Sequence, residues 1–166
     1  MSDERIAQFE KKFDEMDTGK DGKMKAKEFN ALYAELEGKE CTQEESDVMF
    51  RGIDIDNSGT VTKEEFMDMV KAVVNNDDLY TYKLIFRAFD KDRSKALECK
   101  EVIAIHKYCG KEVTQEQVEK FMVEETGKKN GKITFAMLYK LLTGKKIAAE
   151  TDPYDGKLKS KCCLLL

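Results

Sequence analysis

The chain has 166 residues, of which 41% are apolar and 37% are charged, and its formal net charge is −4. This apolar share can build the core of one domain or of two lobes of about 70–80 residues, while the acidic balance argues against nucleic-acid binding. A single Pro among 166 residues favours a helix-rich chain.

Targeting signals and cysteine spacing indicate the compartment. The N-terminal residues do not pair a basic segment with an apolar run, and no window approaches the 18 apolar residues of a membrane span. The five cysteines follow neither a disulfide nor a zinc pattern; they are Cys41, Cys99, Cys109, Cys162 and Cys163. We therefore expect a cytoplasmic protein with reduced thiols.

A repeat organises the chain into four helix–loop–helix units. Four segments spaced 36 or 37 residues apart place Gly, or a residue in its position, two residues before an aliphatic side chain; they begin at Gly22, Gly59, Lys95 and Gly131. Apolar residues recur at three- and four-residue intervals on both sides of each segment, which predicts amphipathic helices. Capping-box motifs predict helix starts after Thr42 and Thr114.

The first loop, residues 17–28, has part of the oxygen set that a hard cation such as Ca2+ requires. Its candidate ligands are Asp17, Asp21, the Lys23 carbonyl and Glu28. Gly19 removes the side-chain ligand at the third position, and four Lys against three acids give the loop a charge of +1. Because charge count tunes affinity, we expect a weak site.

The second loop, residues 54–65, fits the twelve-residue calcium loop at every diagnostic position. Its predicted ligands are Asp54, Asp56, Ser58, the Thr60 carbonyl and Glu65, with Thr62 acting directly or through water. Gly59 permits a left-handed turn, and the loop charge is −3. This loop is predicted to be the strongest site.

The next segment, Val74 to Leu79, favours a helix stop and a new start capped by Asp77 or Asp78. A flexible joint and a continuous helix both stay open here.

The third loop, residues 90–101, has a complete oxygen set but lacks the glycine. Its predicted ligands are Asp90, Asp92, Ser94, the Ala96 carbonyl and Glu101, with Glu98 acting directly or through water. Lys95 must adopt a left-handed conformation there, at a cost of roughly 1 kcal/mol, so we expect weakened rather than lost binding.

The fourth loop, residues 126–137, has Lys128 at the third position, Met137 in place of the closing Glu, and no carboxylate. We expect it to bind no calcium. Gly131 and Ile133 predict that its turn and its strand pairing with Leu97 survive as support for the third loop.

These motifs resemble those of calmodulin-type EF-hand proteins with four hands in two pairs, over residues 5–143. The resemblance implies an all-α fold with short loop-to-loop β bridges, an N-terminal lobe over 1–76 and a C-terminal lobe over 77–143. It also implies Ca2+ as cofactor and a sensor that exposes an apolar groove to bind amphipathic helices of target proteins. Six of the eight Met, counting Met1, lie in the first half, which favours that lobe as the adaptable one.

Two alternatives stay open: a calcium buffer, and a constitutive light-chain-like subunit with little calcium dependence. We expect a monomer. We also expect no enzyme activity, because the single His, His106, has no recognisable catalytic partner.

The tail, residues 144–166, has the composition of an unstructured segment. Its last four residues, Cys163-Leu-Leu-Leu, fit a geranylgeranylation signal in a eukaryotic source, with Cys162 as a second lipid site. Three nearby Lys would favour an anionic leaflet. We therefore expect tethering at the cytoplasmic face of a membrane.

Overall fold

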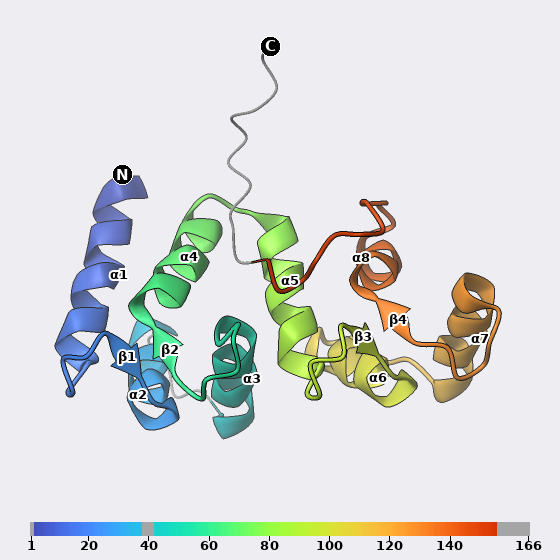
Figure 1. Cartoon of the computed structure of the whole chain (residues 1–166), viewed down its shortest axis with the longest axis horizontal. Coiled ribbons are helices and arrows are strands. Elements are labelled where there is room, and N and C mark those ends of the chain that lie inside the picture. Colours follow the sequence, from blue (N-terminus) through green and yellow to red (C-terminus); the bar gives the residue numbers. More distant parts are fainter. Residues whose placement is uncertain (1, 38–41, 156–166) are drawn as a thin grey trace, which may run out of the picture. The chain divides into compact units, whose positions relative to one another are not determined.

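The computed structural model describes residues 2–37 and 42–155. Over these residues the chain forms helices joined by loops, with two small antiparallel sheets (Figure 1). The elements are, in order, α1 (Ser2–Met16), β1 (Lys23–Met24), α2 (Ala26–Glu37), α3 (Gln43–Ile53), β2 (Val61–Thr62), α4 (Lys63–Val74), α5 (Asp78–Phe89), β3 (Ala96–Leu97), α6 (Cys99–Tyr108), α7 (Gln115–Thr126), β4 (Ile133–Thr134) and α8 (Phe135–Thr143). The predicted all-α fold with short loop-to-loop bridges is confirmed.

Local capping explains where several helices begin. Thr42 and Thr114 form the predicted capping boxes at the starts of α3 and α7. Between α4 and α5 the chain turns through Asn76, which has a φ of 51°, and the Tyr80 N–H donates to Asp77 Oδ1 at 3.1 Å. A carboxylate accepting from the first turn is a helix start, so α4 and α5 are separate helices.

The chain divides into two compact units, which we describe separately, with the division after Thr81 inside α5. In the first unit α1 packs against α4, and α2 packs against α3. The sheet pairs Met24 of β1 with Val61 of β2, and both side chains are fully buried. The Phe13 and Phe66 ring centroids lie 5.2 Å apart in the core. Each helix thus buries its apolar stripe against the others.

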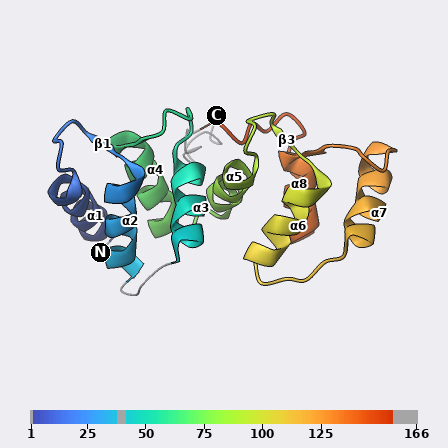
Figure 2. The same ribbon diagram turned by 90° about the horizontal axis from the view of Figure 1, so that it is seen from below.

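The second unit, residues 82–154, repeats this plan with α6 packed against α7 (Figure 2). Its sheet pairs Leu97 of β3 with Ile133 of β4, as the sequence predicts. Phe86 and Phe135 make an edge-on ring contact with centroids 5.6 Å apart. The predicted boundaries at 1–76, 77–143 and 144–166 stay predictions.

The start of the tail packs against the second unit. Gly144, with a φ of 73°, ends α8, and Pro153 is buried with its carbonyl accepting from Arg87 at 2.8 Å. A buried guanidinium needs hydrogen-bond acceptors, and Arg87 has one in a residue 66 positions later in the chain. This contact differs from the unstructured segment that the composition of residues 144–166 predicts. None of the described helices is long and apolar enough to cross a membrane.

Candidate metal centre

The second loop brings three carboxylates together. Oxygens of Asp54, Asp56 and Glu65 all lie within 4.8 Å of one another, although Asp54 precedes β2 and Glu65 lies in the first turn of α4. Among the residues that the structure describes, no other group of acidic, His or Cys side chains meets this distance. Hard oxygen donors in this number fit Ca2+.

The backbone of the second loop wraps around Asp54. The Ser58 N–H donates to Asp54 Oδ1 at 2.9 Å and the Gly59 N–H to Asp54 Oδ2 at 3.0 Å. Two left-handed residues, Asn57 with a φ of 57° and Gly59 with a φ of 78°, aim these N–H groups inward. Asp54 is only 3% exposed, so the loop buries one carboxylate at its centre.

Glu65 joins the end of the loop to its beginning. Its Oε1 accepts from the Ile55 N–H at 2.8 Å, and its Oε2 accepts from the Thr62 N–H at 2.9 Å. The second bond is half of a capping box that starts α4. Glu65 therefore closes the loop and caps the helix at once.

The remaining predicted ligands of the second loop already contact each other. The Ser58 hydroxyl donates to the Thr60 carbonyl at 3.1 Å. Burial raises the pKa of Asp54, with hydrogen bonds from Gly59 and Ser58 opposing that rise, while the hydrogen bond from the Ser58 side chain lowers the pKa of Asp56. The two neighbouring carboxyls thus have pKa values shifted in opposite directions by their different burial and hydrogen bonding.

The third loop has the same backbone with Lys95 in the glycine position. Lys95 takes the left-handed conformation with a φ of 60° and donates its N–H to Asp90 Oδ2 at 2.9 Å, as Gly59 does in the second loop. The Ser94 hydroxyl donates to the Ala96 carbonyl at 2.7 Å. The main chain thus keeps the calcium-loop shape without its usual glycine.

The closing carboxylate of the third loop is arranged differently. Glu101 Oε2 accepts from the Glu98 N–H at 2.9 Å, which caps α6. In the second loop the Ile55 N–H donates to the closing Glu65. The equivalent N–H of the third loop, that of Lys91, donates instead to the Phe89 carbonyl at 2.9 Å. Asp90, Asp92 and Glu101 are not among the gathered carboxylates, so this loop is less closed than the second.

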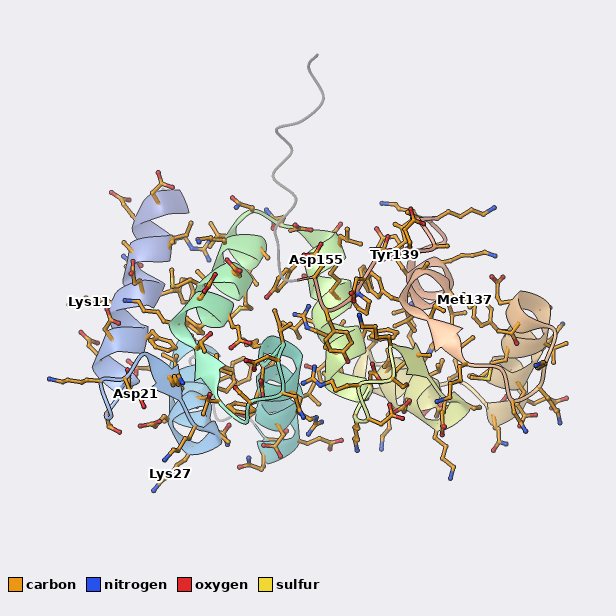
Figure 3. The ribbon with its side chains drawn as sticks, in the orientation of Figure 1. Lys11, Asp21, Lys27, Met137, Tyr139 and Asp155 are labelled. Carbon is orange, nitrogen blue, oxygen red and sulfur yellow. The ribbon has the colours of Figure 1, made fainter. Side chains whose placement is uncertain are left out.

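The first loop also has the calcium-loop backbone. Lys20 and Gly22 are left-handed, with φ values of 51° and 73°, and the Gly22 N–H donates to Asp17 Oδ2 at 2.8 Å. Glu28 accepts from the Thr18 hydroxyl, which lowers the Glu28 pKa. The Lys23 N–H donates to Asp21 Oδ1 at 3.0 Å; Figure 3 labels Asp21 between α1 and β1.

One buried carboxylate oxygen of the first loop lacks a hydrogen-bond donor within the described residues. Asp17 is 6% exposed, and its Oδ1 is buried with no hydrogen-bond partner within the described part of the chain. A buried carboxylate oxygen without a donor is costly. A cation would satisfy this oxygen, and its missing donor adds a signal for Asp17 that the sequence does not contain.

The fourth loop has lost this backbone. Gly131 is not left-handed; the left-handed residue is Gly127, which ends α7. The Thr126 hydroxyl donates to the Met122 carbonyl at 2.7 Å, and Met137 lies on α8 (Figure 3). A turn is present here, since the Gly131 N–H donates to the Lys128 carbonyl at 3.1 Å, but it is not the left-handed calcium-loop turn, because Thr126 offers no carboxylate for a position-six N–H.

Replacing Gly131 by Ala should destabilise the second unit by roughly 2 kcal/mol, because overpacking forces neighbours aside. A Cβ at Gly131 would lie 1.8 Å from the Thr126 hydroxyl oxygen and 2.7 Å from the Thr126 Cβ. Urea unfolding of metal-free protein measures the change. Lys128→Ala, an exposed change in the same loop, is the control, and equal stability of the two variants would contradict the clash.

The loops and strands together define an EF-hand protein. Residues 20–72 match the family model for an EF-hand domain pair. The chain is 29% identical over 124 residues to "Probable calcium-binding protein CML13" of Oryza sativa subsp. japonica, covering 74% of this chain and 73% of that protein. It is 24% identical over 139 residues to "Putative calmodulin-like protein 6" of the same organism, covering 81% of each. The chain is therefore similar to calmodulin-like EF-hand calcium-binding proteins, and Ca2+ is the cofactor that fits its acidic loop.

Proposed function

We propose that the protein is a calcium sensor with its principal site in the second loop. The ligands are Asp54, Asp56, Ser58, the Thr60 carbonyl and Glu65. The observation that carries this assignment is the gathering of three carboxylates whose oxygens lie within 4.8 Å of one another. Like charges at such distances repel, and a bound divalent cation supplies the compensating charge.

Two further loops take part in this proposal. The third loop is a second site, with Asp90, Asp92, Ser94, the Ala96 carbonyl and Glu101 as ligands. The first loop is a weaker site, with Asp17, Asp21, the Lys23 carbonyl and Glu28 as ligands. The shared left-handed residues and inward N–H groups of these loops support both assignments.

The sensor role rests on how Glu65 connects the second loop to α4. Glu65 bonds to the loop through Ile55 and caps α4 through Thr62, so a change at Glu65 bears on the position of that helix. Two methionines of α4 near Glu65 are buried, Met67 and Met69 each being 8% exposed. Flexible Met side chains suit a surface that accommodates amphipathic target helices.

Calcium-dependent exposure of apolar surface tests the sensor role. Metal-free protein in excess magnesium should bind little hydrophobic dye, and added calcium should raise dye fluorescence several-fold as Met67 and Met69 become accessible. Calcium uptake in calorimetry without a dye response would identify a buffer. High dye binding with and without calcium would identify a constitutive light-chain-like subunit, and either result would contradict a sensor.

We also propose membrane tethering through Cys163, with Cys162 as a second lipid site, at the cytoplasmic face. Both residues lie outside the described residues, so the support is the sequence pattern Cys-Leu-Leu-Leu alone. Expression in a eukaryotic host should give protein that carries a geranylgeranyl thioether on Cys163, detected by mass spectrometry of the C-terminal peptide, and that is recovered in the membrane fraction. Cys163→Ser should abolish both, and unmodified protein from the host would contradict the proposal.

A further inference from the structure

Residues Thr151–Tyr154, which we call the strap, lie against the third loop and are the feature that the calcium sites leave unexplained. The Tyr154 hydroxyl donates to Asp90 Oδ2 at 2.7 Å. Asp152 makes an ion pair with Lys95 at 2.7 Å. The strap thus contacts the first ligand of the loop and the residue that replaces its glycine.

The strap is anchored by buried groups. Arg87 is 1% exposed and donates to the Pro153 carbonyl at 2.8 Å, while the Arg93 guanidinium lies 5.1 Å from the centre of the Tyr154 ring. The Tyr154 hydroxyl is the donor in the bond to Asp90, because a carboxylate can only accept.

The geometry distinguishes support of the site from competition with it. The Ser94 N–H donates to Asp90 Oδ1 at 3.0 Å and to Asp92 Oδ1 at 3.1 Å, so Oδ1 is the Asp90 oxygen on the side of the other ligands. Tyr154 bonds to the opposite oxygen, Oδ2, which already accepts from the Lys95 N–H. The strap therefore leaves Oδ1 with the same backbone partner that it has in the second loop.

The ion pair between Asp152 and Lys95 compensates for the absence of glycine at position 95 of the third loop. Lys95 is a non-glycine residue with a φ of 60°, and its ammonium adds positive charge to a cation site. Asp152 offsets that charge, and the ion pair draws the Lys95 side chain toward the strap. The second loop has Gly59 at this position and needs neither contact.

We propose that Tyr154 and Asp152 are positioning residues for calcium at the third loop: Tyr154 orients Asp90 through Oδ2, and Asp152 compensates Lys95. This inference rests on the proposed assignment of the third loop as a site. It gives residues far along the chain the role of outer-shell partners, whose loss typically weakens metal affinity by about 10–100-fold.

The parent for these tests is the full chain with Glu28→Gln and Glu65→Gln, which weakens the first and second loops. Calorimetry of this parent then measures calcium binding at the third loop. In this parent, Tyr154→Phe keeps the ring over Arg93 and should weaken calcium binding by about tenfold. Asp152→Asn removes the negative partner of a half-exposed ion pair and should weaken calcium binding by roughly threefold. Two controls should leave the affinity unchanged: Glu150→Gln, an exposed acid of the same segment, and Tyr82→Phe.

A coupling measurement separates positioning from general stability. With Lys95→Gly added, Asp152→Asn should lose its effect on affinity, because the charge that it compensates is gone. Linkage also requires calcium to strengthen the strap, so exchange of the Tyr154 N–H, which bonds to Asp152 Oδ1 at 2.9 Å, should slow when calcium is added.

The outcomes that overturn the inference are distinct. Glu101→Gln in this parent should abolish calcium uptake if the third loop is a site. If the parent binds no calcium, or if Glu101→Gln leaves its binding unchanged, both the assignment and the inference fail. If Glu101→Gln abolishes the uptake but Tyr154→Phe leaves the affinity unchanged, only the positioning role fails. Tighter binding in Tyr154→Phe, with faster Tyr154 exchange in calcium, would mean that the strap competes with calcium.

Discussion

Replacing Glu65 by Gln is expected to weaken the tightest calcium-binding event by roughly 100-fold, because the second loop loses the carboxylate that closes it and one of its charges. The metal-free protein should change little. Gln is an accepted capping-box residue, and its side-chain oxygen can replace one of the bonds that Glu65 makes to Ile55 and Thr62. The measurement is calorimetry of metal-stripped protein titrated with calcium.

Glu64→Gln is the matched control for this experiment. Glu64 is the preceding residue and is exposed, so its substitution removes the same charge without touching the closing position. It should change affinity by less than about threefold through long-range electrostatics alone. An unchanged tight phase in Glu65→Gln, or equal losses in the two variants, would show that the second loop is not the principal site.

Replacing Phe66 by Ala should destabilise the metal-free first unit by about 3–5 kcal/mol, the usual cost of emptying a buried aromatic position. Phe66 is fully buried and its ring packs on Phe13. This loss is comparable with the whole stability of a small domain. Denaturant unfolding followed by circular dichroism measures it, because the chain has no Trp.

Calcium should restore much of the stability that Phe66→Ala removes. A ligand that binds only the folded state at 100 times its Kd contributes about 2.7 kcal/mol. The control is Val73→Ala on the same helix, where the side chain is 53% exposed and the expected change is within about 0.5 kcal/mol. A Phe66→Ala loss no larger than that of Val73→Ala would contradict this account of the core.

The sequence alone determined the repeat and the fold class. The 36- or 37-residue spacing, the apolar periodicity and the oxygen side chains at alternate loop positions are local properties, which need no knowledge of packing. The capping boxes at Thr42 and Thr114 could be predicted for the same reason, since a cap and its partner lie three residues apart. The predicted pairing of Leu97 with Ile133 followed from the repeat and is confirmed.

Only the tertiary structure decided how the loops differ from one another. The ligand types do not reveal that Glu65 accepts from the Ile55 N–H, or that the Lys91 N–H donates to the Phe89 carbonyl. They also do not reveal that Asp17 Oδ1 lacks a donor within the described residues. Each of these features depends on where the main chain directs its N–H groups. The Gly131 turn shows the same dependence: it is present without a left-handed Gly131, because a glycine permits that conformation but does not require it.

The strap shows the same limit over a longer distance. Tyr154 and Asp152 lie in a segment whose composition predicts no structure, and nothing near them in the sequence points to Asp90 or Lys95. Their contacts arise because the buried Arg87 needs an acceptor and finds the Pro153 carbonyl. Local patterns therefore determined which residues can bind calcium, whereas long-range burial and hydrogen bonding decided how those residues are held.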